Sequence, residues 1–345
     1  MSAVPARMSA VQLTGHGGPE KLVWRDDLPV PRPGPGEVLV RVLAAGVNMT
    51  DINTRLGWYG DADRKAGWAG ELAFPRIQGS DLCGRIVVLG EGVEGLPLGA
   101  RVICPTNQHE PTEENPIHFV SIGSEFDGAF AQYCVVKARH LHDVSASPLP
   151  DIEIGAMPCA YGTAENLLSR ARVAVGERVL VTGASGGVGL AAVQLALLRG
   201  AEVTAQCSPA KADPLRALGA GILPRDATPP ARSFDVVIDI VGGDGFQARL
   251  DALRPSGRYA TSGAVGGPTV TGDLRRIYLN DLTLYGATHQ PREVFAGLVT
   301  IINKGRLRPV VSKTYPLRDI AEAQADLAAG RYPGKLVLVP PEPQP

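Results

Sequence analysis

The second half of the chain alternates short runs of branched apolar residues with longer segments of helical periodicity. The segment 188–198 contains a single polar residue, Gln194, which is typical of a helix buried nearly all round. Parallel strands need crossover helices between them, so this alternation predicts a doubly wound parallel sheet. The predicted strands are 178–182, 201–206, 235–240, 257–262 and 282–286, and the predicted helices are 188–198, 211–218, 244–253 and 273–280.

Residues 30–150 have a different sequence pattern, with frequent glycine and proline between short apolar runs. This pattern is typical of an all-β, barrel-like domain. The sequence therefore predicts an α/β protein with a first domain over 1–155 and a parallel-sheet domain over 156–290. We expect the tail, 291–345, to return to the first domain. The strands expected in the first domain are 37–42, 85–90, 100–104 and 129–136, and the tail contains helices 292–303 and 317–329 with extended runs 310–315 and 335–339.

A glycine-rich turn over 183–189 joins the first predicted strand of the sheet to its apolar helix. A strand, a tight glycine turn and a closely packed helix form the phosphate cradle of a dinucleotide site, where backbone N–H groups face the pyrophosphate. Ala184 replaces the first glycine of the usual G-x-G-x-x-G pattern, so a turn that only packs the helix is the alternative. The candidate cofactor-binding residues of the turn are Ser185, Gly186, Gly187 and Val188. Ligands in such sheets bind at the carboxyl ends of strands, where Gly242, Ser262 and Gly263 also fall.

The end of the second predicted strand indicates which dinucleotide is bound. An NAD site usually has an acid here to bind the ribose 2′-hydroxyl, but the stretch 204–211 contains none. Ser208 can donate a hydrogen bond to a 2′-phosphate and Lys211 can neutralise it. An ordinary solvated lysine is the alternative for Lys211. Together these features favour NADPH.

Composition excludes several classes of partner. The formal net charge is −1 and there is no basic cluster, which speaks against nucleic acid or an anionic membrane as a partner. No apolar stretch is long enough to span a bilayer and residues 1–8 lack the apolar core of a signal peptide, so we expect a cytoplasmic protein. The five cysteines form no C-x-x-C pair, so neither a structural zinc site nor a dithiol redox site is expected.

Seven motifs in order along the chain resemble the medium-chain dehydrogenase/reductase superfamily, specifically its zinc-free quinone-oxidoreductase branch, which includes zeta-crystallin-like proteins. The resemblance implies a GroES-like β-barrel catalytic domain interrupted by a Rossmann domain, an active site in the cleft between them, and a homodimer. The motifs are Pro33-Gly34-Pro35-Gly36-Glu37-Val38-Leu39-Val40, Ala45-Gly46-Val47-Asn48-Met49-Thr50-Asp51, Gly79-Ser80-Asp81-Leu82-Cys83-Gly84-Arg85-Ile86, Asp127-Gly128-Ala129-Phe130-Ala131-Gln132-Tyr133, Tyr161-Gly162-Thr163-Ala164, Ala184-Ser185-Gly186-Gly187-Val188-Gly189 and Gly334-Lys335-Leu336-Val337-Leu338.

The superfamily also has a zinc alcohol dehydrogenase branch, whose three catalytic-zinc ligand positions fall on Asn48, Ser80 and a point near Gly155. A catalytic zinc needs thiolate and imidazole ligands, so no metal site is expected. Without a Lewis acid to stabilise the alkoxide, the oxidation of a simple alcohol is harder. Reduction of a quinone or an activated C=C bond does not require a metal ion. That reduction needs hydrogen-bond donors where charge develops on a carbonyl oxygen.

The resemblance also implies roles for single residues. Asn48 would lie near the nicotinamide and substrate, where its amide can donate to the carbonyl oxygen; a turn residue after a strand is the alternative. Asp51 would orient its neighbours, and Tyr59 matches a tyrosine that lines the substrate site. The position that carries a second tyrosine in that branch is Asn53 here, so this chain departs from the branch at a residue linked to quinone specificity. Thr163 and Lys335 would also contact the cofactor, with strand-end packing as the alternative for Lys335.

We therefore expect an NADPH-dependent, zinc-independent reductase of quinones or α,β-unsaturated carbonyls, whose partner is a small electrophilic substrate. The alternatives are an enoyl-thioester reductase of a biosynthetic pathway and a non-catalytic NADPH-binding sensor or structural protein. Two segments, 58–74 and 104–126, depart from the family. The first is interpreted as a substrate-facing loop containing Trp58 and Trp68, or as surface packing, and the second as a solvated loop or subunit contact.

Overall fold

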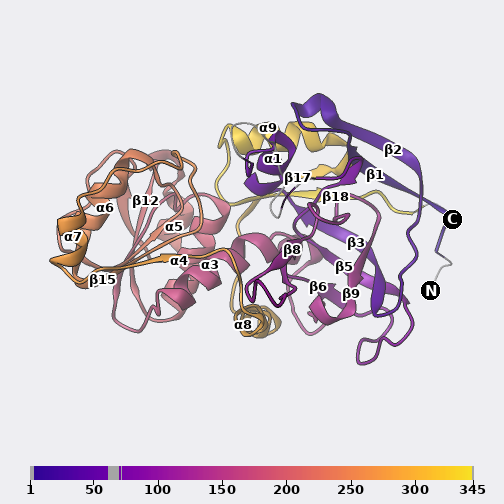
Figure 1. Cartoon of the computed structure of the whole chain (residues 1–345), viewed down its shortest axis with the longest axis horizontal. Helices are drawn as coiled ribbons and strands as arrows, with labels where there is room; N and C mark the ends of the chain where they lie inside the picture. The colour runs from indigo at the N-terminus through magenta and orange to yellow at the C-terminus, as the bar shows by residue number, and fades with distance from the viewer. Residues whose placement is uncertain (1–3, 61–69, 71, 344–345) are drawn as a thin grey trace. The chain divides into compact units, whose positions relative to one another are not determined.

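The computed structural model describes residues 4–60, 70 and 72–343, and the chain divides into two compact units (Figure 1). Unit 1 consists of Met1–Cys159 together with Ala296–Pro345, and unit 2 consists of Ala160–Phe295. Helices α3 (Pro158–Arg170) and α8 (Arg292–Asn303) carry the chain from one unit into the other. In the described part of the chain, no helix is both long enough and apolar enough to cross a bilayer.

Unit 1 is built on a mainly antiparallel sheet with the strand order β10-β6-β5-β3-β18-β17, to which β9 adds by pairing with β3. A smaller sheet, β2-β1-β4, and a hairpin, β7-β8, complete it. The strands are β1 (Arg7–Leu13), β2 (Leu22–Pro29), β3 (Glu37–Gly46), β4 (Arg76–Ile77), β5 (Cys83–Leu89), β6 (Arg101–Ile103), β7 (Asn107–His109), β8 (Phe119–Ser121), β9 (Tyr133–Lys137), β10 (His142–Asp143), β17 (Val311–Pro316) and β18 (Lys335–Val339), and the helices are α1 (Met49–Leu56), α2 (Asp151–Gly155) and α9 (Ile320–Ala328).

One apolar core joins the distant segments of unit 1. Side chains from β1, β3, β5, β9 and β18 pack in the same cluster, with Phe130 and Leu338 fully buried. The last strand, β18, pairs antiparallel with β3, with Val337 opposite Gly46. This long-range pairing places Lys335, the first residue of β18, beside the end of β3 and the start of α1.

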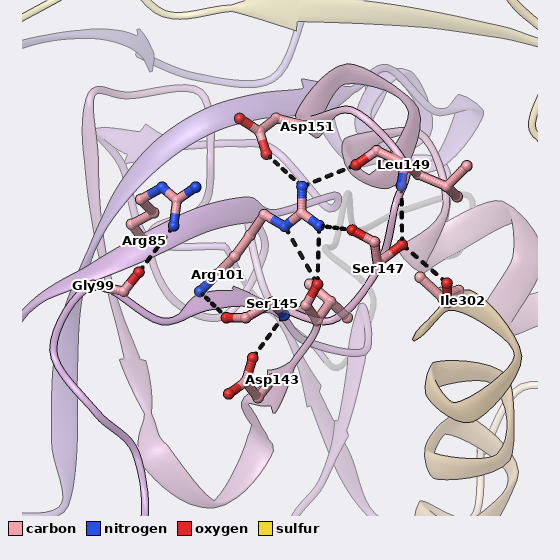
Figure 2. A network of polar contacts seen from close by, with 10 residues as sticks. Arg85, Gly99, Arg101, Asp143, Ser145, Ser147, Leu149, Asp151 and Ile302 are labelled. Atoms are coloured by element: carbon pink, nitrogen blue, oxygen red, sulfur yellow. Dashed lines mark hydrogen bonds and ion pairs between the residues drawn. The ribbon is translucent and has the colours of Figure 1, made fainter. Parts of the chain in front are cut away.

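A buried arginine fixes the segment that leads out of unit 1 (Figure 2). Arg101 is 8% exposed, and its guanidinium donates to backbone carbonyls of residues 144–149 and to Asp151 at the start of α2. Ser147, whose carbonyl accepts one of these bonds, donates its own hydroxyl to the carbonyl of Ile302 at 2.9 Å. Arg101 therefore ties the approach to α2 to the end of α8.

Unit 2 is a parallel sheet of order β13-β12-β11-β14-β15-β16. The order reverses between β11 and β14, and right-handed crossovers then put helices on both faces, as in a doubly wound Rossmann sheet. The predicted α/β class is therefore confirmed. The strands are β11 (Arg178–Val181), β12 (Glu202–Cys207), β13 (Gly221–Pro224), β14 (Phe234–Asp239), β15 (Leu253–Thr261) and β16 (Thr283–Gly286), and the helices are α4 (Gly187–Leu198), α5 (Asp213–Ala217), α6 (Phe246–Ala252) and α7 (Leu274–Tyr278).

The sequence pattern did not predict several of the strands and helices. β13 was not predicted, because its four residues begin with glycine, end with proline and are all at least partly exposed. β1, β2 and α1 to α3 were missed as well, since their apolar positions follow no long period. The predicted helix 211–218 is broken into a single turn, Pro209–Lys211, and α5, because Pro214 cannot donate to the preceding turn.

Candidate functional site

Asn48 and Asp51 stand at the beginning of α1, directly after β3. Asn48 precedes the helix, and its backbone N–H donates to Oδ2 of Asp51 at 2.8 Å. The other carboxylate oxygen, Oδ1, accepts the backbone N–H of Ser80 at 3.1 Å. Asp51 thus caps its own helix and holds the segment before β5 against it.

The side-chain amide of Asn48 is fully engaged within unit 1. Its Nδ2 donates to Oγ of Ser80 at 3.1 Å and to Oδ2 of Asp81 at 2.8 Å, while its Oδ1 accepts a hydrogen bond from Lys335. An amide nitrogen has two hydrogens, and both are used here. A bond from Asn48 to a substrate oxygen, the role suggested by the resemblance, would have to replace one of them.

The ammonium of Lys335 is equally occupied. It donates to the carbonyl of Val47 at 3.1 Å, to Asn48, and to Oδ2 of Asp81 at 3.1 Å. Lys335 is 4% exposed and Asp81 is 0% exposed, so this is a buried ion pair. With its three hydrogens used, Lys335 would have to give up one of these bonds to contact a cofactor.

Burial changes the protonation of Asp51 in this cluster, which comprises Asn48, Asp51, Ser80, Asp81 and Lys335. Burial and the charge of Asp81 raise the pKa of Asp51 to about 7, although the Asn48 N–H and Lys335 act in the opposite direction. Cys159 lies beside the cluster, where its backbone N–H donates to Oδ1 of Asp81 at 2.6 Å. Burial and the nearby carboxylates raise the pKa of its thiol to about 12, so the thiol is protonated at neutral pH.

The residues at the zinc positions do not fit a zinc ion. Asn48 and Ser80 offer neutral amide and hydroxyl groups rather than imidazole or thiolate, and the ammonium of Lys335 stands within bonding distance of Asn48 and Asp81. A second cation would be repelled there. Among the described residues, no group of three or more His, Cys, Asp or Glu side chains is arranged to hold a metal ion.

Tyr59 lies near this cluster, where its hydroxyl donates to Oγ1 of Thr50 at 2.9 Å. Burial raises its pKa, and Cys159 and Asp51 add to that effect. The neighbouring Trp58 is 47% exposed and packs edge-on against Tyr59, with ring centroids 5.4 Å apart. Residues 61–69 and 71 lie outside the described part, and with them Trp68 of the predicted substrate-facing loop.

The glycine-rich turn of unit 2 has the geometry of a phosphate cradle. Gly183 adopts φ +56°, a left-handed conformation that favours glycine. A Cβ on Gly189 would lie 2.3 Å from the carbonyl oxygen of Gly183, so only glycine lets α4 approach the strand this closely. Gly186 precedes α4, and the first N–H groups of a helix have no partner within the helix. Ser185, Gly186, Gly187 and Val188 are therefore grouped at a helix N-terminus that suits a pyrophosphate.

The predicted 2′-phosphate residues follow β12. Ser208 begins the turn that contains Lys211, whose N–H donates to the Ser208 carbonyl at 3.0 Å. β13 runs parallel beside β12, which brings Arg225 to the same edge of the sheet. Gln206 donates to the Arg225 carbonyl at 3.1 Å. Burial raises the pKa of Cys207, and the charge of Arg225 acts to lower it. Sequence reasoning missed Arg225, because β13 was not recognised as a strand.

The remaining predicted cofactor residues lie at the ends of other elements in unit 2. Gly242 follows β14 with φ +64°, and Ser262 and Gly263 follow β15, all at the carboxyl edge of the sheet. The loops after β14 and β15 are joined, since the Gly266 N–H donates to the Val241 carbonyl at 2.7 Å. Thr163 is half-buried on α3. Among the predicted cofactor residues, Lys335 alone belongs to unit 1.

Comparisons with known proteins agree with this architecture. Residues 34–146 match the alcohol dehydrogenase GroES-like domain, and residues 223–338 match the zinc-binding dehydrogenase family. The chain is 31% identical to an acryloyl-coenzyme A reductase from Metallosphaera sedula, over 96% of this chain and 99% of the relative. It is 28% identical to a quinone oxidoreductase from Rattus norvegicus, over 96% and 98%. A crystal structure from Sinorhizobium meliloti 1021, described as a candidate alcohol dehydrogenase, has a TM-score of 0.92 at 44% identity, over 98% of both chains.

Proposed function

This chain belongs to the medium-chain dehydrogenase/reductase superfamily, and on that premise we propose that it is a zinc-independent, NADPH-dependent reductase of quinones or α,β-unsaturated carbonyls. Its GroES-like domain, its Rossmann sheet and its similarity to oxidoreductases over nearly the whole chain are those of an oxidoreductase that uses a nicotinamide cofactor. Zinc independence, the preference for NADPH and the substrate are the proposed part.

The cluster around Asn48 carries the proposal. A zinc-dependent dehydrogenase needs anionic or imidazole ligands to hold the zinc ion that stabilises an alkoxide. Here the corresponding positions carry an amide and a hydroxyl, and both the ammonium of Lys335 and the carboxylate of Asp81 bond to Asn48. Without metal ligands at these positions, the site suits the reduction of an electrophilic carbon conjugated to a carbonyl, whose oxygen needs hydrogen-bond donors rather than a Lewis acid.

Each unit has a distinct task in the proposed reaction. When bound, NADPH supplies the hydride. The backbone N–H groups at the start of α4 hold its pyrophosphate, and Ser185 lines the same turn. In unit 1, the hydroxyl pair of Tyr59 and Thr50 can bind the carbonyl oxygen of a substrate, because Tyr59 donates to Thr50 and leaves the Thr50 hydrogen available for another acceptor. Solvent can supply the proton.

The end of β12 supports NADPH over NADH. Ser208, Lys211 and Arg225 provide a hydroxyl and two cations at one edge of the sheet, and the stretch 204–211 contains no carboxylate. A 2′-phosphate carries negative charge that these groups can bind, whereas the ribose hydroxyls of NADH usually need an acid at this point.

The similarity to an acryloyl-coenzyme A reductase favours a second candidate function, the reduction of an enoyl thioester. The chemistry is the same, because a thioester carbonyl also activates the adjacent C=C bond. A requirement for a carrier-bound acyl chain distinguishes this candidate from reduction of free quinones and enones. A protein that binds NADPH without turnover is the third candidate.

A homodimer formed through unit 2 also belongs to the proposal. β16 is an edge strand of the parallel sheet, and Leu284 in it is 39% exposed. Near it in sequence, Leu274, Tyr278 and Leu279 are between 63% and 72% exposed. An exposed edge strand with apolar neighbours supports pairing with a second copy. Light scattering after gel filtration should give twice the chain mass, and a monomer would contradict this part of the proposal.

The test of function is NADPH oxidation followed at 340 nm with a chelator present. The acceptors are 1,4-benzoquinone, 9,10-phenanthrenequinone, trans-2-hexenal and crotonyl-CoA, each with NADH in parallel. Chelator-insensitive turnover that prefers NADPH is expected with a quinone or enone. Turnover with crotonyl-CoA alone would favour the thioester reductase, and loss of turnover with the chelator would contradict zinc independence. Binding of NADPH without turnover of any acceptor would favour the non-catalytic candidate.

A further inference from the structure

A buried carboxylate at the end of β14 bonds to two loops at the carboxyl edge of the parallel sheet in unit 2. Asp239 is 0% exposed. Its Oδ1 accepts the hydroxyl of Thr182 at 2.5 Å and the backbone N–H groups of Val241 at 2.9 Å and Gly242 at 3.3 Å. Thr182 immediately precedes the glycine-rich turn, so one carboxylate oxygen links that turn to the loop after β14.

The second oxygen of Asp239 anchors an arginine on α6. Arg249 is 8% exposed, and its Nη1 donates to Oδ2 of Asp239 at 2.8 Å and to the carbonyl of Gly242 at 2.6 Å. The hydroxyl of Tyr259 donates to the same carboxylate oxygen. The N–H of Gly242 is therefore held by Asp239, and its carbonyl is held by Arg249.

The loop that this ion pair holds has a backbone conformation open only to glycine. Gly242 and Gly243 both have φ +64°, and a Cβ on Gly243 would lie 2.3 Å from the carbonyl oxygen of Gly266. The Gly243 N–H donates to Gly267 at 3.1 Å. Glycine adopts such a conformation without strain but is free to adopt many others, so the surroundings must constrain the loop to a single shape. The buried ion pair beneath the loop supplies that constraint.

We propose that Arg249, together with Asp239, is a positioning residue for cofactor binding: it holds the loop Val241–Gly243 in the shape that NADPH requires, through its bond to the Gly242 carbonyl. This inference rests on the proposed function, because it assumes that the carboxyl edge of the sheet binds the nicotinamide cofactor. The bond to Gly242 is what distinguishes Arg249 from the other donors to Asp239.

Arg249 and Tyr259 both donate to Oδ2 of Asp239. Substituting each in turn distinguishes a role in positioning the loop from a contribution to the stability of the fold alone. Arg249→Met removes the bonds to both Asp239 and Gly242, while Tyr259→Phe removes one bond to Asp239 and leaves the Gly242 bond intact. The full-length proteins are titrated with NADPH by fluorescence, and their Tm values are recorded. We expect R249M to raise the Kd for NADPH about tenfold or more, because a bond from a charged donor is lost. We expect Y259F to bind within threefold of the unsubstituted protein, although both variants lower Tm.

Kinetics provide a second readout, and Arg249→Lys guards against a variant that does not fold. R249M should raise KM for NADPH more than it lowers kcat at saturating cofactor, and R249K, which keeps a cationic donor, should recover part of the affinity. Equal Kd values for folded R249M and the unsubstituted protein would overturn the inference, as would equal losses of affinity in R249M and Y259F or an R249K variant that folds but binds no better than R249M. If the unsubstituted protein itself binds no NADPH, the proposed function fails, and that result is distinct from these two.

Discussion

Lys335, at the start of the last strand, donates a hydrogen bond to the carboxylate of Asp81 at 3.1 Å, across 254 positions of sequence. Both side chains are buried, and Asn48 bonds to both of them. The cluster therefore depends on the return of the C-terminal segment to β3. A buried ion pair adds little net stability over apolar packing, but the loss of one partner leaves a buried charge unpaired.

Lys335→Met should consequently lower the free energy of unfolding by about 3–5 kcal/mol, because Asp81 then keeps its charge without a partner. Asp81→Asn in the same chain should recover part of that loss, since it removes the orphaned charge. Urea unfolding of the two single variants and the double variant measures the coupling. Additive losses in the double variant would mean that the two side chains do not interact.

Asp51 should make stability depend on pH between about 4 and 7. Its pKa is raised from 3.8 to about 7, so the folded protein holds a proton that the unfolded chain releases in this window. Stability is then fully present below the unfolded pKa and falls as pH rises toward 7, by an amount on the order of 1–3 kcal/mol between pH 5 and 8. Asp51→Asn, which does not titrate, should flatten this slope in urea unfolding across the same range. An unchanged slope would place the titration elsewhere.

Tyr59→Phe should reduce kcat/KM for a quinone or enone by about tenfold, because the phenol supports the Thr50 hydroxyl as a donor. Thr50→Val should give a similar loss. The double variant should lose little more than either single variant, since the two hydroxyls act as a unit. Trp58→Phe serves as the control, because it keeps an aromatic ring beside Tyr59 and removes no hydrogen bond of this pair. Additive effects would show independent roles.

Ser208→Glu should shift the cofactor preference toward NADH, because a carboxylate repels a 2′-phosphate and binds a ribose 2′-hydroxyl. Arg225→Ala should lower kcat/KM for NADPH by about tenfold while leaving that for NADH nearly unchanged, since it removes one cation from the edge of the sheet. Steady-state kinetics with both cofactors gives the ratio. If Arg225→Ala affects both cofactors equally, Arg225 does not contact the 2′-phosphate.

Arg101→Met should destabilise the protein by about 3 kcal/mol or more, because several buried carbonyl groups and Asp151 lose their donor at once (Figure 2). Arg85→Met is the matched control. Arg85 is exposed and donates to the Gly99 carbonyl at 3.0 Å, so its loss should cost well under 1 kcal/mol. Thermal and urea unfolding of both variants test the difference, and equal losses would contradict the role given to Arg101.

Local sequence patterns were sufficient for the fold class and for placing the glycine-rich turn before a helix. The alternation of strands and helices predicted the parallel sheet, and the glycine-rich turn predicted the helix N-terminus that suits a phosphate. Both are local signals, because the period of a strand and the conformational needs of a turn are set by neighbouring residues. Arg225 was missed because it reaches the edge only when β13 pairs with β12.

The chemistry of the cluster around Asn48 was decided by tertiary structure. The resemblance to the superfamily placed Asn48 and Ser80 at the zinc positions and Lys335 in a terminal motif, but it did not indicate which hydrogen bonds each side chain makes. Pairing of β18 with β3 brings Lys335 to Asn48 and Asp81, and the amide hydrogens of Asn48 are then used within the protein. Which hydrogen bonds form in a buried cluster depends on contacts between segments far apart in sequence. A local sequence pattern does not predict these contacts.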